Sequence, residues 1–458
     1  MIISNHIIPS KVTFVGEQKT LDLKAICVFS ALGFFLDDDT YCIEQKALQP
    51  ATIYKLDEQN KIVSKEAYFK WHHAPQERSL RQITEEFAAL FEQILKEQSE
   101  NKKVILPLSG GLDSRSQACG LHHIGANVQA YSYSFENGHN ETAYSKQIAK
   151  TCGFPFQALS VPKGYLWDKV EDLAKINGCY SDFTHPRQMA FIDQYAAMGE
   201  IFSLGHWGDV LFDDMGVKDD LSFEAQVQLL FKKVVKKGGL ELATELWKAW
   251  NLEGDFKDYL HERLSTLLKK INIPESANAQ IRAFKSMYWA PRWTSVNLSV
   301  FESQRPIALP YYDNRMCEFI CSVPEKQLAG RQIQIEYMKM RNPALAKIAW
   351  QSQKPFNLYN YHWNKKPYNL PYRIMDKAKR ILSTQNYVQR NWELQFLGSE
   401  NESYLQHYLF QNEKMNAIIP KSLTAEFYRK FQQENDVYYS HSVSMLLTLS
   451  LFIKSLKA

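Results

Sequence analysis

Residues 104–115 read Val-Ile-Leu-Pro-Leu-Ser-Gly-Gly-Leu-Asp-Ser-Arg, and this stretch decides the fold of the chain. Its first five residues form an apolar run that predicts a buried strand, and the residues from Ser114 onward can open a helix. The turn between them is Ser-Gly-Gly, which lets the backbone approach a ligand and aims consecutive amides at one anion. The start of the following helix adds to that attraction, because its free N–H groups carry partial positive charge. The stretch therefore predicts an anion-binding loop between a strand and a helix.

Asp113 is the unusual residue of this loop, since a carboxylate repels the anion that the amides attract. The conflict disappears if a magnesium ion lies between them, because Mg²⁺ binds both carboxylate and phosphate oxygens. The alternative is an ordinary corner between a strand and a helix, for which Ser-Gly-Gly is suitable turn chemistry. The order of strand, turn, Asp, Ser and helix favours the phosphate-binding interpretation.

The hexapeptide at 109–114 resembles the pyrophosphate-binding loop of ATP pyrophosphatases. That group includes the synthetase domains of asparagine, GMP and NAD synthetases, which split ATP between its α and β phosphates and attach AMP to a substrate oxygen. The resemblance implies an α/β fold with a parallel sheet of the PP-loop, adenine nucleotide alpha-hydrolase-like type, extended by C-terminal helices. It implies ATP and Mg²⁺ as cofactors. It also assigns nucleotide binding to a set of loop residues, namely Leu108, Ser109, Gly110, Gly111, Asp113 and Ser114.

A second segment narrows the resemblance to asparagine synthetases and their relatives. Residues 201–204 predict a strand, and Gly-His-Trp-Gly-Asp follows at 205–209. The family carries a similar strand, a glycine-rich turn, an Asp and a Phe. The match implies that Asp209 is the second magnesium ligand beside Asp113, and that Gly205 lies against the nucleotide. Two carboxylates at the ends of neighbouring strands suit this role, since together they can bridge a metal to pyrophosphate.

Two more segments continue the resemblance. A strand that begins near Val128 leads to Ser132 and Ser134, where family members read adenine with backbone groups. Residues 349–356 resemble the segment that carries a catalytic lysine over the adenylate, which implies that role for Lys354. An ammonium there can stabilise the charge that grows on phosphate and on the tetrahedral intermediate. The alternative for Lys354 is a solvated surface charge, one of 54 Lys and Arg residues.

The chain departs from asparagine synthetase on the acceptor side of the implied site. His206 stands where that enzyme has an acidic residue that handles aspartate, and Val210 replaces the acidic residue after the metal-binding Asp. The acceptor therefore need not be aspartate. Ring-closing relatives such as beta-lactam synthetase place a Tyr–Glu pair here, and His206 with Glu302 could act similarly, since neutral imidazole is a fitting base for an amine. The alternative is that His206 packs as an aromatic neighbour of Trp207.

The N-terminal residues predict a small β-rich domain at 1–78, followed by a synthetase domain at 79–458. Residues 33–41 and 49–54 indicate two short strands around an acidic turn and resemble the closing strands of a glutaminase domain. The cysteine nucleophile of such a domain is missing, because the first cysteine is Cys27. The resemblance implies a truncated remnant without glutaminase activity. Ammonia would be free, come from a separate glutaminase, or be replaced by a substrate amine.

Composition limits the class of protein and its partners. The chain has 458 residues, 45% of them hydrophobic and 23% charged, as expected for a globular protein of two or three domains. A net charge of +4 argues against a dedicated nucleic-acid binder, and no apolar run is long enough for an integral membrane protein. Seven scattered cysteines show neither a disulfide framework nor zinc spacing and indicate a reducing cytoplasm.

Hydrophobic periodicity and local composition outline the remaining organisation. The expected elements are a helix at 79–98, a helical insertion at about 216–275, an ordered loop or lid at 354–372 and a basic helix at 371–384. For the basic helix, a solvated face and a membrane-surface patch both stay open.

Together, these patterns predict an ATP-dependent, AMP-forming amide ligase that adenylates a carboxylate and transfers it to ammonia or an amine. A sugar acid, or a peptide or metabolite carboxylate, is a better candidate acceptor than free aspartate. One alternative is a ligase that uses an amine of its own substrate, as beta-lactam synthetase and lasso-peptide cyclase do. The other is a non-catalytic nucleotide-binding relic, against which Asp113 and Asp209 count.

Overall fold

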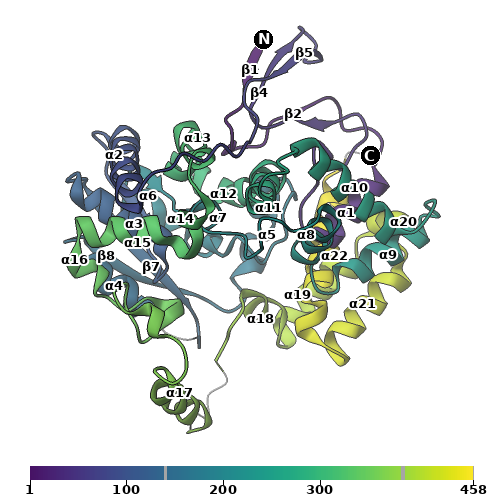
Figure 1. Ribbon diagram of the computed structural model, residues 1–458. Coiled ribbons are helices and arrows are strands. Elements are labelled where there is room, and N and C mark those ends of the chain that lie inside the picture. The colour runs from purple at the N-terminus through teal and green to yellow at the C-terminus, as the bar shows by residue number, and fades with distance from the viewer. Residues whose placement is uncertain (139–141, 383–386, 457–458) are drawn as a thin grey trace.

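A five-stranded parallel sheet forms the centre of the computed structural model, which describes residues 1–138, 142–382 and 387–456 (Figure 1). The strand order is β10-β9-β6-β7-β8, and every neighbouring pair is parallel. The strands are β6 (Val104–Pro107), β7 (Val128–Phe135), β8 (Phe156–Val161), β9 (Ile201–Ser203) and β10 (Ile307–Ala308). The predicted α/β fold with a parallel sheet is confirmed.

The strand order places a ligand-binding crevice beside β6. The chain runs from β6 through β7 to β8 on one side, and later adds β9 and β10 on the other side. The loops that follow β6 and β9 therefore diverge at neighbouring strand ends, which is where open parallel sheets bind their ligands. The two sequence motifs at 109–114 and 205–209 both lie at this point.

Helices on this half of the molecule follow from the apolar spacing of the sequence. α2 (Leu80–Ser99) begins with a capping box between Ser79 and Gln82 and buries an apolar stripe that includes Phe87 and Phe91. α3 (Leu112–His123) follows the loop after β6, and α15 (Gln332–Arg341) packs against both α2 and α3. The other helices near the sheet are α4 (Thr142–Thr151), α5 (Tyr165–Asn177), α6 (Tyr195–Met198), α7 (Gly208–Leu211), α12 (Ser295–Glu302), α13 (Asn314–Cys321), α14 (Glu325–Leu328) and α16 (Pro343–Ala346).

A second, wholly helical half lies beside the sheet in Figure 1. The residues predicted as a helical insertion contain α8 (Phe223–Val234), α9 (Gly239–Ala249) and α10 (Phe256–Ile271), and α11 (Ala277–Phe284) and a π-helix (Lys285–Thr294) follow. The C-terminal helices complete this half: α18 (Asn391–Phe396), α19 (Ser399–Phe410), α20 (Glu413–Ile418), α21 (Lys421–Gln433) and α22 (Asp436–Ser455). α22 is buried from Ser442 to Ile453 and forms the centre of this core.

The N-terminal segment has two small antiparallel sheets and one helix. β4 (Thr52–Leu56) pairs with β1 (Ile2–Ser4) and β5 (Ile62–Ala67), and β2 (Phe14–Val15) pairs with β3 (Lys46–Ala47). The prediction of a strand at 33–41 is wrong. α1 (Leu23–Leu32) precedes it and ends at Gly33, and the residues beyond form turns.

The physical reason lies in where the apolar side chains of this segment go. Asp22 caps α1 by accepting a hydrogen bond from Ala25 N, and α1 packs against α9. Phe34 and Phe35 are buried in the large core rather than on one face of a small sheet. Cys27 is also buried in α1, and burial raises the pKa of its thiol. The domain boundary at residue 78 stays a prediction.

α17 (Leu370–Leu382) covers most of the predicted basic helix and stands away from the rest of the ribbon in Figure 1. Residues 383 and 384 of that prediction lie outside the described residues. Short 3₁₀ turns at Gln351–Gln353 and Tyr361–Trp363 occupy the loop before α17. In the part of the chain that the structure describes, no helix combines the length and the apolar character needed to cross a bilayer.

Candidate active site

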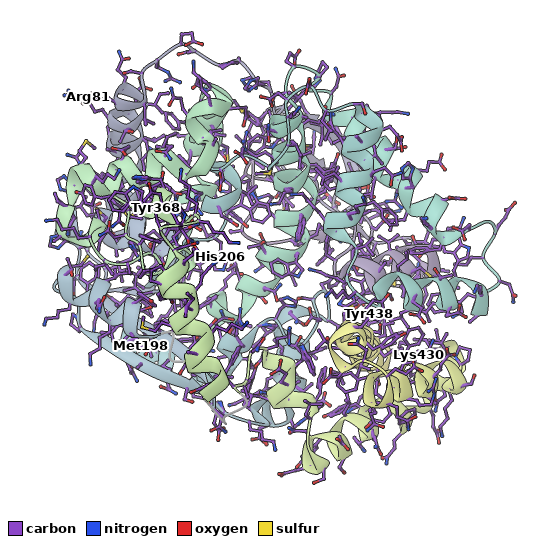
Figure 2. All side chains as sticks on the ribbon, turned by 60° about the horizontal axis from the view of Figure 1, so that its bottom comes forward. Arg81, Met198, His206, Tyr368, Lys430 and Tyr438 are labelled. Atoms are coloured by element: carbon purple, nitrogen blue, oxygen red, sulfur yellow. The ribbon has the colours of Figure 1, made fainter. Side chains whose placement is uncertain are left out.

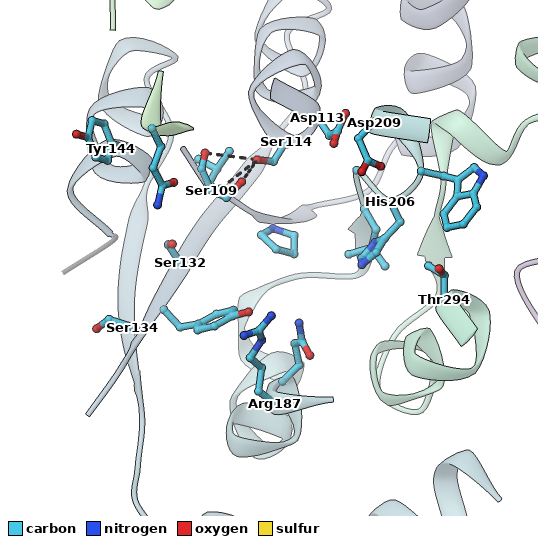
Figure 3. Close-up of a pocket in the computed structure, with 18 of the residues that line it drawn as sticks. Ser109, Asp113, Ser114, Ser132, Ser134, Tyr144, Arg187, His206, Asp209 and Thr294 are labelled. Atoms are coloured by element: carbon cyan, nitrogen blue, oxygen red, sulfur yellow. Dashed lines mark hydrogen bonds between the residues drawn. The ribbon is translucent and has the colours of Figure 1, made fainter. Parts of the chain in front are cut away.

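A cavity of about 1960 Å³ opens at the ends of β6, β7 and β9 (Figure 3). Its position is central: in Figure 2, His206 lies between Arg81 of α2 and Lys430 of α21. Ten of the residues predicted for the site line the cavity, namely Leu108, Ser109, Asp113, Ser114, Ser132, Ser134, Gly205, His206, Asp209 and Lys354. Gly110, Gly111 and Glu302 are not among its lining residues.

The loop at 109–114 curls back onto the first turn of α3. The backbone N–H of Ser109 donates to Ser114 Oγ at 3.0 Å, and the two hydroxyl oxygens are also 3.0 Å apart, as the dashed lines in Figure 3 show. The Gly111 N–H donates to Ser109 Oγ at 3.2 Å. The Gly110 N–H donates to Gln351 Oε1 at 3.1 Å, from the same segment that carries Lys354. These bonds hold the loop in shape at the N-terminus of α3, where an anion is attracted.

Arg115 connects this loop to the segment that carries Lys354. Its guanidinium is fully buried and donates to the carbonyl oxygens of Gly110, Ile348 and Ala349 at 3.1, 3.0 and 2.8 Å. Burial lowers the pKa of Arg115 to about 10. Sequence reasoning missed this residue, because two of its three partners, Ile348 and Ala349, lie more than two hundred positions away along the chain.

Asp113 and Asp209 face one another across the top of the cavity in Figure 3. Asp113 pairs with Arg331 and accepts a hydrogen bond from Gln334 Nε2 at 3.1 Å. Burial raises the pKa of Asp113 to about 6; Arg331 opposes this shift, and the negative charge of Asp209 adds to it. Arg331 and Gln334 were not predicted, since nothing in their local sequence indicates a partner across the cavity.

The residues present fit a magnesium ion. The negative charge of Asp209 adds to the raised pKa of Asp113, and a cation between the two carboxylates would offset that repulsion; Asp209 is exposed to the cavity. Mg²⁺ is commonly held by one or two carboxylates together with phosphate oxygens and water. Within the described residues there is no group of three or more His, Cys, Asp or Glu side chains placed to hold a metal.

Gly205 is needed for the turn after β9 to reach the loop after β6. A Cβ atom at this position would lie 2.9 Å from Gln117 Oε1 and 3.1 Å from the Ser114 backbone nitrogen. Only glycine allows this approach without moving the first turn of α3. Gly205 therefore lies against the first turn of α3, and its contact with the nucleotide stays a prediction.

His206 points into the cavity, but it does so without Glu302. Burial lowers the pKa of His206 to about 4, and its Nδ1 atom has no hydrogen-bond partner among the described residues. Glu302 is exposed at the end of α12, whereas its neighbour Phe301 lines the cavity. Successive helix residues point about 100° apart, so both cannot face the cavity. The predicted His206–Glu302 pair is therefore not formed.

Two lysines line the cavity, and only one of them was predicted. Lys354 is exposed at the mouth of the cavity. Lys285 lies deeper, and burial lowers the pKa of its ammonium, although the charge of Asp209 opposes the shift. The only local signal for Lys285 is the recurrence of Trp at 289 and 293, four and eight positions later.

Ser132 and Ser134 lie with Tyr144 on the opposite side of the cavity from His206 and Thr294 (Figure 3). Arg187 closes this region from below, and its guanidinium lies 5.7 Å from the ring centroids of both Tyr133 and Phe135. The cavity is thus divided into a serine-lined part at β7 and a second part at the π-helix.

Comparison with known proteins tests part of this assignment. Residues 86–201 match the asparagine synthase family. The matched stretch includes β6, the loop at 109–114 and β7, which confirms the predicted resemblance over these residues. It ends before Asp209 and Lys354, so the roles of these two residues stay predictions.

Other comparisons add no functional assignment. The NMN synthetase from Francisella tularensis is similar at 15% identity and a TM-score of 0.23, over 45% of this chain and 92% of that one. The U34-tRNA thiolase NcsA from Methanococcus maripaludis, whose structure has a [4Fe-4S] cluster, is similar at 11% identity and a TM-score of 0.22, over 71% and 89%. No curated protein matches the chain.

Proposed function

We propose that this protein is an ATP-dependent, AMP-forming ligase that adenylates a carboxylate and transfers it to a nitrogen nucleophile. An asparagine synthase domain indicates an ATP-using ligase or synthetase in general terms. The observation that carries the finer proposal is the meeting of the 109–114 loop with Asp113 and Asp209 in one cavity. An AMP-forming enzyme must hold the β and γ phosphates as a leaving group, and this arrangement suits pyrophosphate.

Different residues of the cavity would bind ATP, hold the metal ion and stabilise the transition state. The hydroxyls of Ser109 and Ser114 and the amides at the start of α3 would bind the pyrophosphate part of ATP, with adenine towards Ser132 and Ser134. Asp113 and Asp209 would hold Mg²⁺, which when bound offsets charge on the phosphates. The Lys354 ammonium would stabilise charge that develops on the α phosphate and on the acyl oxygen.

His206 would remove a proton from the attacking nitrogen. A base must be unprotonated at the working pH, and the lowered pKa of His206 keeps its imidazole neutral. His206 lines the cavity, and its Nδ1 atom has no hydrogen-bond partner among the described residues, so a proton acceptor is available to a bound nucleophile. An imidazole with this pKa is too weak a base to deprotonate a free ammonium, so it would take the proton after the nitrogen has bonded to the acyl carbon and carries positive charge. The same step would serve ammonia and an amine carried by the substrate.

Exchange of labelled pyrophosphate into ATP tests the proposal without a nitrogen donor. We expect exchange that depends on an added carboxylic acid and on Mg²⁺, because adenylation is reversible before nitrogen attack. A panel of sugar acids, amino acids and aromatic acids would identify the acceptor class. Binding of ATP without carboxylate-dependent exchange for any acid would favour the non-catalytic relic.

A further inference from the structure

The part of the cavity at the π-helix is lined by residues that the nucleotide does not need. They include Lys285, Trp289, Trp293 and Thr294, and Figure 3 shows Thr294 and His206 across the cavity from Ser132 and Ser134. This part borders Asp209, so a molecule bound there would lie beside the phosphates. It is the place for the acceptor that the proposed function requires.

Three indoles and two ammonium groups alternate along this wall, which we name the Trp–Lys wall (Trp207, Lys285, Trp289, Lys236 and Trp293). Lys285 Nζ lies 5.7 Å from the ring centroids of both Trp207 and Trp289. Lys236 Nζ lies 5.7 Å from the centroid of Trp289 and 5.8 Å from that of Trp293. Such cation–π contacts keep the ammonium groups in place without neutralising them.

The two lysines of the wall lack a direct anionic partner. In the described part of the chain, neither Lys285 nor Lys236 forms an ion pair, and burial lowers the pKa of both. Taking an ammonium out of water without a counter-charge costs free energy, and a bound anion would recover it. Lys285 is the one of the two that lines the cavity, and it is therefore the group that an anion can reach.

Unsatisfied polar atoms on the same wall also indicate a ligand. His206 Nδ1 and Trp293 Nε1 are buried and have no hydrogen-bond partner among the described residues. Buried polar atoms normally have partners, so these two residues of the cavity lining keep hydrogen-bonding capacity that a bound molecule can use. The indoles and Phe301 beside them offer apolar surface to the rest of the same molecule.

The cavity has too few acidic residues to bind an acceptor that carries an ammonium group. Of the described lining residues, only Asp113 and Asp209 are acidic, and both belong to the proposed metal site. An α-amino acid such as aspartate would bring an ammonium group towards Lys285 with no carboxylate left to receive it. A carboxylate that carries no ammonium near its acid group meets no such repulsion.

We propose that the Trp–Lys wall is the acceptor subsite, and that it takes a carboxylate carried on a ring-sized body without a neighbouring ammonium. Lys285 binds the carboxylate beside Asp209, and Trp289, Trp293 and Phe301 pack against the ring. His206 and Trp293 provide the remaining polar contacts. This inference rests on the proposed function only in that the bound carboxylate is the one to be adenylated.

Binding of benzoate tests this subsite separately from catalysis. Benzoate has a carboxylate on a flat ring, benzamide is its neutral counterpart, and aspartate adds the ammonium. In nuclear magnetic resonance titrations with MgCl₂ and without ATP, we expect benzoate to bind at least ten times more tightly than benzamide or aspartate. Lys285→Met should abolish the preference and Lys285→Arg should keep it. Lys365→Met, which removes an exposed lysine that is not among the lining residues of the cavity, should leave it unchanged.

Several results would overturn the inference. They are equal binding of benzoate and benzamide, no benzoate binding, tight aspartate binding, or a preference that survives Lys285→Met or disappears in Lys365→Met. Thermal melting of each variant shows whether it is folded, and Lys285→Arg keeps the test valid if Lys285→Met does not fold. If the wild-type protein exchanges pyrophosphate but does not bind benzoate, the acceptor subsite is refuted and the proposed function is not. If it binds benzoate but forms no adenylate, the proposed function alone is refuted.

Discussion

Single residues in this protein owe their properties to partners that are distant in sequence. Asp113 lies in a motif that the sequence alone reveals. Its pKa, however, is raised by burial, lowered by Arg331 and raised by the charge of Asp209. His206 was predicted as half of a pair, but the helical turn at Phe301 directs Glu302 to solvent. The sequence therefore indicates which residues carry chemistry, and the fold determines how each of them is tuned.

Asp209→Asn should lower turnover about a hundredfold or more, because it removes charge from the proposed magnesium site. The side chain is exposed to the cavity, so the melting temperature should stay close to that of the wild type. Carboxylate-dependent pyrophosphate exchange measures the effect, with exposed Asp220→Asn as the matched control. Near-normal exchange in Asp209→Asn would show that the second metal ligand lies elsewhere.

Lys354→Ala should lower the rate of adenylate formation on the order of a hundredfold while changing ATP affinity little, because its charge is needed most in the transition state. Lys354→Arg should restore little of the lost rate, since a planar guanidinium does not replace a compact ammonium. Single-turnover rates and ATP binding are measured together, with Lys365→Ala on the same loop as the control. A dead Lys365 variant beside an active Lys354 variant would mean that the wrong lysine was assigned.

The lowered pKa of His206 predicts a distinct pH dependence of stability. The unfolded histidine binds a proton below about pH 6.5, whereas the folded one does so only near pH 4. The unfolded state therefore holds more protons between these values, and folding stability falls as the pH drops through this window. Relative to His206→Gln, the wild type should lose on the order of 1 kcal/mol between pH 7.5 and pH 5 in urea unfolding. A constant difference between the two proteins would show that His206 is not desolvated.

At the scale of elements, the sequence pattern correctly predicted those strands, helices and turns whose formation depends on neighbouring residues. The strand at β6, the helices α2 and α3 and the turn between them follow from apolar spacing, glycines and a capping box. The strand expected at 33–41 failed because α1 and the residues after it bury their apolar side chains against α9 and the large core. A short apolar run looks the same in the sequence whether it forms a strand of a small sheet or is buried in a large core, and only tertiary packing decides between the two.

Arg115→Met tests the connection between two of these elements. The change leaves the carbonyl oxygens of Gly110, Ile348 and Ala349 without their buried donor, so we expect a loss of about 2–3 kcal/mol in the free energy of unfolding. Pyrophosphate binding should weaken as well, because the loop and the Lys354 segment lose their shared anchor. Arg81→Met, which removes an exposed Arg on α2, should change neither quantity. Unaltered stability in Arg115→Met would contradict the anchoring role.

At the scale of the whole molecule, the site belongs to the junction of the two halves. The parallel sheet provides the loop and Asp113, whereas the π-helix that follows the helical insertion provides Lys285, Trp289 and Trp293. The sequence motifs predicted the first contribution because a nucleotide site follows a fixed local pattern. They could not predict the second, because an acceptor pocket is made by side chains that meet only after the halves have packed together.

The products formed from ATP decide whether this protein is an AMP-forming ligase. Phosphorus nuclear magnetic resonance would follow ATP with the protein, MgCl₂, ammonium chloride and a mixture of small ring carboxylic acids. We expect AMP and pyrophosphate in equal amounts, formed only when an acid is present and absent with Asp209→Asn. Formation of ADP and phosphate as the stoichiometric products would contradict it.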